Sequence, residues 1–246
     1  MRSPRLLVAA CAVAGLLAGC AALPDAPGGL PSNYVPSVPA SDVALQGNLS
    51  PDGFSVAQRM TVRVRNVGCD SLKTGTGFAY DAHTLITNRH VVEDTRKLQV
   101  TTYDGRTIAV TAASVAAVAD LAIITTEEAI GPGAVLAQED PVEGDAVTVV
   151  GYPNGGRLTS VSGVVLGATG DPLGAALGAV LATTAPVEPG SSGSPVLNER
   201  GEVVGVIYAK NEAEQSFMVP VSLLRTLLDE EQLLVPQQQN CTSSLT

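Results

Sequence analysis

The residues best suited to take part in a reaction are a histidine, an aspartate and a serine that lie far apart in the sequence. Ser192 lies in the turn Gly190-Ser191-Ser192-Gly193-Ser194-Pro195. Glycines permit a sharp turn that exposes a hydroxyl and directs successive backbone N–H groups to one point, where an oxyanion can form. Taken alone, such a segment is more typical of an ordinary turn. It also differs from the Gly-x-Ser-x-Gly nucleophile elbow, because residue 194 is serine.

His90 and Asp120 are the candidates to activate that serine. His90 follows an apolar run that ends at Thr87, and Asp120 precedes the apolar run Leu121–Ile124. An aspartate at the start of a strand is often only a capping residue, but beside a histidine it would fix the imidazole tautomer and stabilise the imidazolium. The other histidine, His83, lies in a polar turn and is interpreted as a surface residue. The chain order His, Asp, Ser therefore predicts a nucleophilic serine with a histidine base.

Short strands are the elements that must position these residues. From about residue 56 to 220, β-rich runs alternate with glycine and proline turns, a pattern typical of an all-β barrel or sandwich. Gly131-Pro132-Gly133 divides the runs into two groups, and leucines at helical spacing predict a helix over about 221–231. The expected strands are Met60–Val67, Gly77–Tyr80, Thr84–Thr87, Lys97–Tyr103, Ile108–Ala117, Leu121–Thr125, Ala146–Gly151, Thr159–Leu166, Val180–Thr184, Pro195–Leu197, Val203–Tyr208 and Phe217–Val219.

Three of these segments together resemble the signatures of trypsin-like (chymotrypsin-fold) serine proteases. Thr87–Val92, Asp120–Ala122 and Gly190–Pro195 are most similar to those of the bacterial HtrA/Deg-type branch, and Gly75–Phe78 and Gly151–Pro153 resemble further strands of that branch. The resemblance implies a protease domain over residues 55–246. It would contain two six-stranded antiparallel β-barrels, at about 55–130 and 131–220, and a C-terminal helix.

The same resemblance implies the roles of individual residues. Ser192 attacks the scissile carbonyl, His90 transfers the proton, and Asp120 orients His90. The backbone N–H groups of Gly190 and Ser192 form the oxyanion hole. A specificity pocket is expected to be lined by five residues, none of them acidic, which favours a small or medium apolar side chain before the cleaved bond; the alternative is that these residues are simply core. The five are Pro186, Val187, Ala209, Phe217 and Met218.

Two features depart from that family pattern. Ser194 stands where the family usually has glycine, so a need for positive φ or close backbone approach there would distort the oxyanion hole. Only 18 residues follow Leu228, so no PDZ domain is expected after the protease domain. These departures leave open a second function, that of a catalytically weak binding lipoprotein with a protease fold.

The N-terminal segment resembles an export signal. A short basic start precedes the apolar run Leu6–Gly19. This run is too short for a membrane-spanning helix, which needs about 20 residues, but it matches the apolar part of an export signal. The run ends in Leu-Ala-Gly-Cys, which resembles a bacterial lipobox. We therefore expect a signal peptide over 1–19 and lipidation of Cys20, the alternative being an ordinary signal peptide. Residues 20–54 are rich in proline, glycine and serine and are predicted to be a linker.

Composition and cysteines limit the remaining classes of function. The formal net charge of −10 makes binding to nucleic acid or to anionic lipid by charge alone unfavourable. Cys69 and Cys241 are left as an even pair in an exported protein, which predicts a disulfide; two free thiols are the alternative. No metal-ligand motif or cofactor fingerprint is present. The sequence thus predicts an extracytoplasmic serine endopeptidase of the cell envelope that acts on proteins or peptides, with its oligomeric state open.

Overall fold

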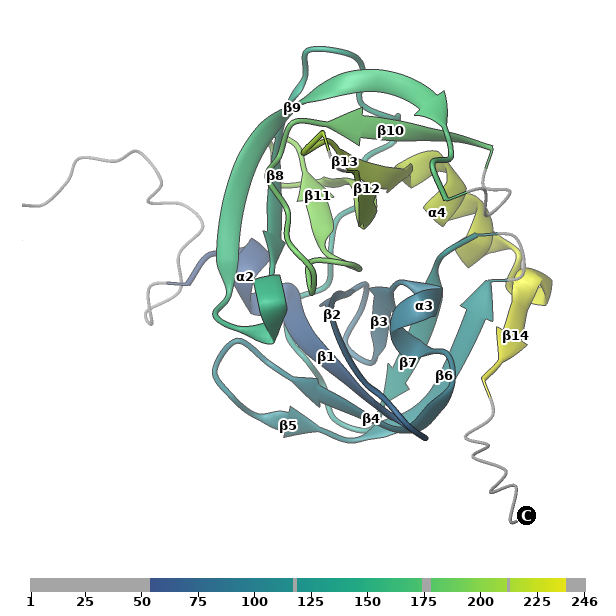
Figure 1. Cartoon of the computed structure of the whole chain (residues 1–246). Helices are drawn as coiled ribbons and strands as arrows, with labels where there is room; N and C mark the ends of the chain where they lie inside the picture. The colour runs from purple at the N-terminus through teal and green to yellow at the C-terminus, as the bar shows by residue number, and fades with distance from the viewer. Residues whose placement is uncertain (1–53, 117–118, 174–177, 212, 238–246) are drawn as a thin grey trace, which may run out of the picture. The chain divides into compact units, whose positions relative to one another are not determined.

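The computed structural model describes residues 54–116, 119–173, 178–211 and 213–237 (Figure 1). The predicted signal peptide, Cys20, Cys241 and all of the predicted linker except Phe54 lie outside these residues. The described part folds as two β-sheet halves that share a core. None of its helices is long and apolar enough to cross a membrane.

The first half is an eight-stranded antiparallel sheet in the order β14-β6-β7-β3-β2-β1-β4-β5. A short helix, α2 (Val56–Met60), precedes it, and Ser55 and Gln58 form a capping box at its start. Another short helix, α3 (Arg89–Val92), follows β3. The strands are β1 (Thr61–Gly68), β2 (Leu72–Ala79), β3 (Thr84–Thr87), β4 (Thr95–Thr101), β5 (Thr107–Ile108), β6 (Val110–Ala116), β7 (Ala122–Thr126) and β14 (Leu234–Pro236).

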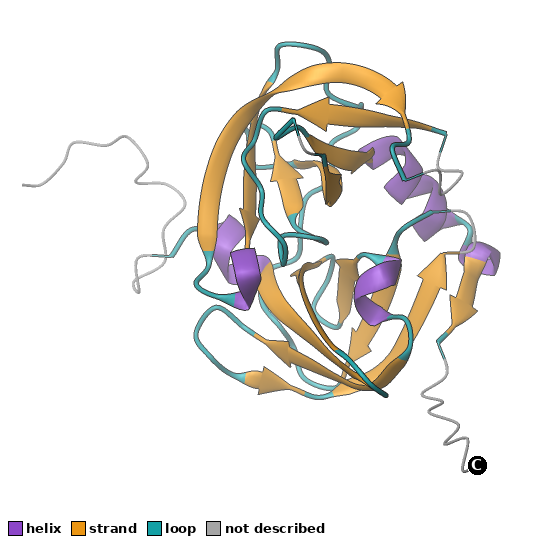
Figure 2. Cartoon of the chain, viewed as in Figure 1, coloured by secondary structure: helices purple, strands orange, loops and turns teal. Residues whose placement is uncertain are grey.

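The second half is a closed antiparallel barrel in the order β10-β13-β12-β11-β8-β9. The 3₁₀ turn η1 (Pro153–Gly155) follows β8, and α4 (Val221–Asp229) follows β13 and leads to the turn η2 (Glu231–Leu233). Figure 2 shows that these helices lie around the outside of the strands. The strands are β8 (Ala146–Gly151), β9 (Thr159–Gly170), β10 (Ala179–Thr183), β11 (Pro195–Leu197), β12 (Val203–Lys210) and β13 (Ser216–Pro220).

Every expected run contains a strand, and the second half has the expected six-stranded barrel. The first half forms an eight-stranded sheet in place of the expected six-stranded barrel, for two reasons. The expected run Ile108–Ala117 is divided at Ala109 into β5 and β6. The segment after α4 adds β14, whose Leu234 pairs with Ala116 of β6. The predicted terminal helix ends at Asp229, two residues before its expected end.

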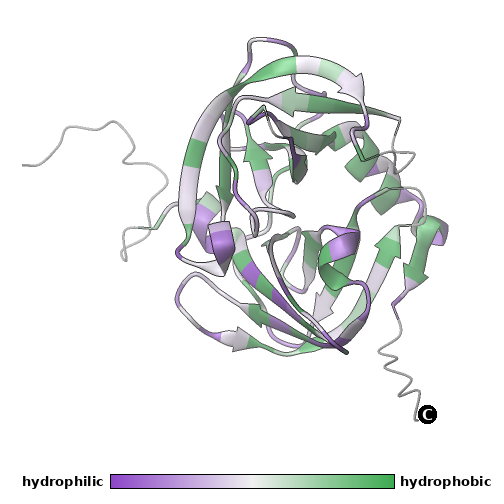
Figure 3. Ribbon diagram, viewed as in Figure 1, coloured by the Kyte–Doolittle hydropathy of each residue, from purple (hydrophilic) through white to green (hydrophobic). Residues whose placement is uncertain are grey.

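Valine, leucine and isoleucine form the shared core, as the near absence of aromatic residues requires. One buried cluster contains Val62 and Phe78 of the first half together with Val206 and Leu224 of the second, so apolar packing fixes the two halves against each other. The alternation of apolar and polar residues along the strands is visible in Figure 3.

Cys69 follows β1 and is disulfide-bonded. Because Cys241 lies outside the described residues, its pairing with Cys69 stays a prediction. The pairing of β14 with β6 brings the C-terminal segment to the first sheet, the half of the molecule that contains Cys69.

Candidate active site

Two side chains hold the backbone that carries His90. Asp120 Oδ1 accepts a hydrogen bond from the His90 N–H at 3.0 Å, near the start of α3. Asn66 is fully buried in β1, and its Nδ2 donates to Val91 O at 3.0 Å and to Glu93 O at 2.8 Å. The free carbonyl groups at the end of α3 thereby gain donors. A helix of four residues has little stability of its own, so these contacts set the position of His90.

The structure brings His90 and Asp120 together. His90 Nδ1 lies 2.7 Å from Asp120 Oδ2, a distance typical of a charge-assisted hydrogen bond. The Asp120 side chain is 6% exposed and the imidazole is 40% exposed. The carboxylate is therefore shielded from solvent, whereas the imidazole is accessible to it. A carboxylate at Nδ1 favours the tautomer with its proton there, which leaves Nε2 as the basic nitrogen.

The loop that contains Ser192 has two backbone donors without an acceptor. Gly190 and Gly193 have φ values of +93° and +88°, which favour glycine. The N–H groups of Ser191, Gly193 and Ser194 donate to carbonyl oxygens. Among the described residues, no acceptor receives the N–H of Gly190 or of Ser192. Two free donors, one of them on the serine itself, are the pattern that an oxyanion site uses.

Thr76 of β2 connects this loop to both halves of the molecule. Its side chain is completely buried, and its Oγ1 donates to Gly190 O at 2.8 Å and accepts from the Tyr152 N–H at 3.0 Å. Its backbone N–H donates to Ser192 O at 2.8 Å. Figure 1 shows the loop before β11 reaching β2. Thr76 therefore holds the Gly190–Ser191 and the Ser192–Gly193 peptide groups.

Gly75 marks the place where the Ser192 loop meets α3. A Cβ at Gly75 would lie 2.6 Å from Val91 Cγ2 and 3.2 Å from Ser192 O. Ser192 itself is half-buried, and within the described residues no hydrogen bond joins its Oγ to His90. The structure thus places the Val91 side chain and the Ser192 carbonyl close to Gly75, with the histidine–aspartate bond formed.

A hollow of about 350 Å³ lies beside the imidazole. Of the five predicted specificity residues, Ala209 lines it, Val187, Phe217 and Met218 are buried in the core, and Pro186 is exposed. Tyr208, which the sequence did not single out, donates its hydroxyl to Asp171 Oδ1 at 2.8 Å. Burial and this hydrogen bond raise the pKa of Tyr208, so it stays neutral. The lining residues are Arg89, His90, Asp120, Leu173, Tyr208, Ala209 and Lys210.

Ser194 does not cause the distortion considered from the sequence. It is not among the described residues with positive φ. Its side chain is fully buried, and its Oγ occupies the space where a Cβ of Gly151 would lie. The loop keeps its conformation because the strand opposite Ser194 has no side chain at that point.

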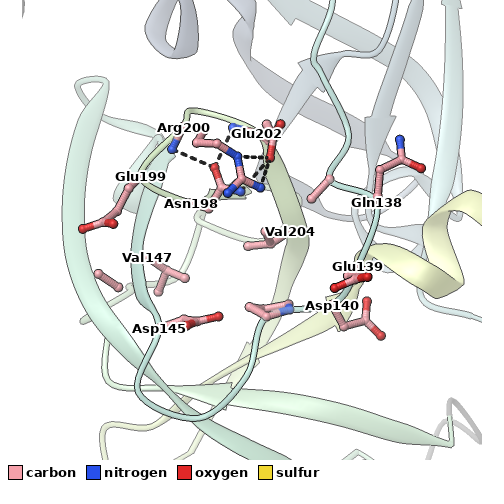
Figure 4. Close-up of a pocket in the computed structure, with 13 residues that line it drawn as sticks. Gln138, Glu139, Asp140, Asp145, Val147, Asn198, Glu199, Arg200, Glu202 and Val204 are labelled. Carbon is pink, nitrogen blue, oxygen red and sulfur yellow. Dashed lines mark hydrogen bonds and ion pairs between the residues drawn. The ribbon is translucent and has the colours of Figure 1, made fainter.

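A separate hollow of about 360 Å³ on the second barrel is lined by many carboxylates (Figure 4). Asp140 accepts from Ser222 Oγ and from the Ser222 N–H at the start of α4, and Glu202 pairs with Arg200. These groups stabilise a helix end and a turn, and the hollow shares no residue with the His90 site. Within the described residues, no group of three or more His, Cys, Asp or Glu side chains is placed to hold a metal ion.

Comparison with known proteins identifies the family. The family model of the trypsin-like peptidase domain matches residues 75–206, more than half of the chain. The chain belongs to this family. The match begins in β2, at the glycine beside Ser192 and Val91, and ends in β12. It therefore contains His90, Asp120 and the Ser192 loop, whereas Asn66 of β1 and the end of β12 lie outside it.

Several relatives of this trypsin-like peptidase are named serine proteases. Serine protease Rv3671c of Mycobacterium tuberculosis is 30% identical over 204 residues, which are 77% of this chain and 50% of the relative. Mitochondrial serine protease HTRA2 of Bos taurus is 34% identical over 164 residues, 64% of this chain and 36% of the relative. The crystal structure of the Rv3671c protease in its active form matches with a TM-score of 0.65 and 25% identity, over 89% of this chain and all of that chain. The chain spans about half the length, or less, of these curated relatives.

Proposed function

We propose that this trypsin-like peptidase is a serine endopeptidase in which His90, Asp120 and Ser192 form the catalytic triad. The observation that carries the proposal is the His90–Asp120 hydrogen bond beside a loop with two free N–H donors. With Asp120 at Nδ1, Nε2 of His90 accepts the Ser192 proton as Oγ attacks the peptide carbonyl, and then protonates the leaving amine. The N–H groups of Gly190 and Ser192 stabilise the oxyanion.

The absence of a hydrogen bond between Ser192 Oγ and His90 is compatible with this role. Ser192 is half-buried and the imidazole is 40% exposed, so a hydroxyl rotation and a small ring movement have room. Such bonds often tighten only when a substrate excludes water from the site. Residues before the cleaved bond are proposed to lie in the hollow lined by Tyr208 and Ala209, where a small apolar side chain fits.

Labelling with a fluorophosphonate tests the proposal. The wild-type protein should be labelled stoichiometrically, and Ser192→Ala should not be labelled. Ser191→Ala is the matched control, because it removes a hydroxyl from the neighbouring residue and should keep the label. Equal labelling of the wild type and Ser192→Ala would refute the triad. Normal folding without labelling or peptide hydrolysis would favour the alternative of a protease-fold binding protein.

The membrane attachment is a separate part of the proposal. Cys20 would carry lipid after removal of residues 1–19, and residues 20–54 would connect it to the protease domain. Acyl chains anchor a protein by burying methylene groups, at about 0.8 kcal/mol each. Metabolic labelling with a fatty acid should mark the full chain and fail with Cys20→Ala, which should also release the protein from membranes. Labelling of Cys20→Ala would contradict the assignment.

A further inference from the structure

A hollow rich in arginine lies beside the Ser192 loop and is not used by the proposed triad. Its volume is about 340 Å³, and it lies between β1 and β2 of the first half and η1 of the second. None of its lining residues lines the hollow beside His90. The lining residues are Arg63, Arg65, Leu72, Thr74, Asn154 and Gly155.

Both arginines present positive charge to this hollow. They are two positions apart on β1, so their side chains lie on the same face of the sheet. Arg63 Nη1 donates to Gly155 O at 3.1 Å, and its guanidinium lies 5.9 Å from the centroid of the Tyr152 ring. Arg63 Nε is buried without an acceptor, and Arg65 is exposed. Among the described residues, no carboxylate lies within ion-pair distance of either guanidinium.

The hollow is adjacent to the predicted oxyanion hole. The Asn154 N–H donates to Pro189 O, and a Cβ at Gly190 would lie 2.9 Å from the backbone nitrogens of both Asn154 and Gly155. Arg63 also pairs across the sheet with Thr76, whose Oγ1 holds Gly190 O. A peptide bound at Ser192 therefore needs only a few residues to reach the guanidinium groups, since an extended chain advances about 3.3 Å per residue.

We propose that this hollow binds a carboxylate of the substrate within the first residues after the cleaved bond. The proposal rests on the proposed function, in which the residues before that bond occupy the hollow beside Ala209. An arginine fork matches a carboxylate in two parallel hydrogen bonds, and the exposed guanidinium of Arg65 can supply such a fork. Leu72, which is 59% exposed at the rim, gives apolar contact to the methylene groups of a glutamate side chain.

Quenched fluorescent peptides in matched pairs test the inference. Each pair has the same apolar residue before the cleaved bond and differs by glutamate or glutamine at one of the next four positions. A further pair ends in a free carboxylate or an amide, which separates a side-chain carboxylate from a chain-terminal one. We expect kcat/KM to be at least tenfold higher for the acidic member at one position, and this ratio to fall with added salt.

Arginine variants locate the effect. Arg65→Gln should reduce the ratio to about twofold, and adding Arg63→Gln should abolish the preference. Arg96→Gln, at an exposed arginine of β4, is the matched control and should keep it. Arg65 is exposed, so its variant tests the inference even if replacement of Arg63 impairs folding. Ratios within twofold for every pair in the wild type would overturn the inference.

Binding separates this inference from the proposed triad. In Ser192→Ala, the preferred acidic peptide should bind at least tenfold more tightly than its glutamine partner, as measured by fluorescence anisotropy. Equal binding of the two peptides would reject the carboxylate site whether or not the wild type cleaves them. Selective binding without any cleavage by the wild type would keep the carboxylate site and reject the endopeptidase.

Discussion

Thr76→Val should separate the stability of the fold from the geometry of the oxyanion hole. Valine has nearly the shape of threonine but no hydroxyl, so the change removes the donor to Gly190 O and the acceptor for the Tyr152 N–H. Each buried polar group left without a partner costs about 1–3 kcal/mol. For two groups we expect a loss of about 2–6 kcal/mol in unfolding free energy. At about 2–4 °C per kcal/mol, the Tm should fall by roughly 4–24 °C.

The same change should lower turnover far more than it lowers substrate affinity. Without Thr76 Oγ1, the Gly190–Ser191 peptide group loses its buried hydrogen bond, so the Gly190 backbone that carries the N–H donor is held less firmly toward the oxyanion. Loss of one such donor lowers kcat by about 10²–10³-fold in acyl-transfer enzymes. Thr76→Ser keeps the hydroxyl and is the control, with kcat within a few fold of the wild type.

Calorimetry and steady-state hydrolysis of one apolar peptide measure the two effects, at a temperature where both variants are folded. A Thr76→Val protein with a lowered Tm and the same kcat as Thr76→Ser would refute the reasoning. The loop would then hold Gly190 through the contacts of Pro189 and Gly193 alone.

Three further changes test other parts of the site. Asp120→Asn should lower kcat by about 10³–10⁴-fold with little loss of folding, because the amide can favour the wrong imidazole tautomer. The rate of acylation in a single turnover measures this loss, and an unchanged rate would contradict the role of Asp120. Burial raises the pKa of Tyr152 to about 12, above its unfolded value near 10, so Tyr152 should lower wild-type stability by about 1.4 kcal/mol per pH unit between pH 10 and 12, in addition to the fall that Tyr208 contributes. Urea titrations of Tyr152→Phe at pH 9.5, 10.5 and 11.5 should give a slope shallower by that amount, and equal slopes would reject the assignment. Gly151→Ala should destabilise the protein by about 1–3 kcal/mol, because the new Cβ would overlap Ser194 Oγ. Adding Ser194→Gly should recover most of the lost stability, and no recovery in the double variant would show that the overlap is not the cause.

Local sequence predicted most of the strands and supplied the candidate site residues, because each depends on information within a few positions. The β-branched runs identify strands, and the glycines around Ser192 identify a loop with unusual backbone angles. The pairing of Leu234 with Ala116 could not be predicted, because more than 100 residues separate the two and the strand has only three. Arg63 and Arg65 show only the alternation of a half-exposed strand, so their place beside η1 depends on how the two halves pack.

The Ser194 question shows why a motif cannot be interpreted one position at a time. Residue 193 must be glycine for two reasons: its φ is +88°, and a Cβ there would overlap Thr76 O. At residue 194 neither reason holds, since φ is not positive and the neighbouring strand has Gly151 in place of a bulkier residue. The constraint is therefore on the summed volume of residues 151 and 194 across the interface between β8 and the Ser192 loop. A serine at 194 leaves the backbone donors of Gly190 and Ser192 in place as long as residue 151 has no side chain.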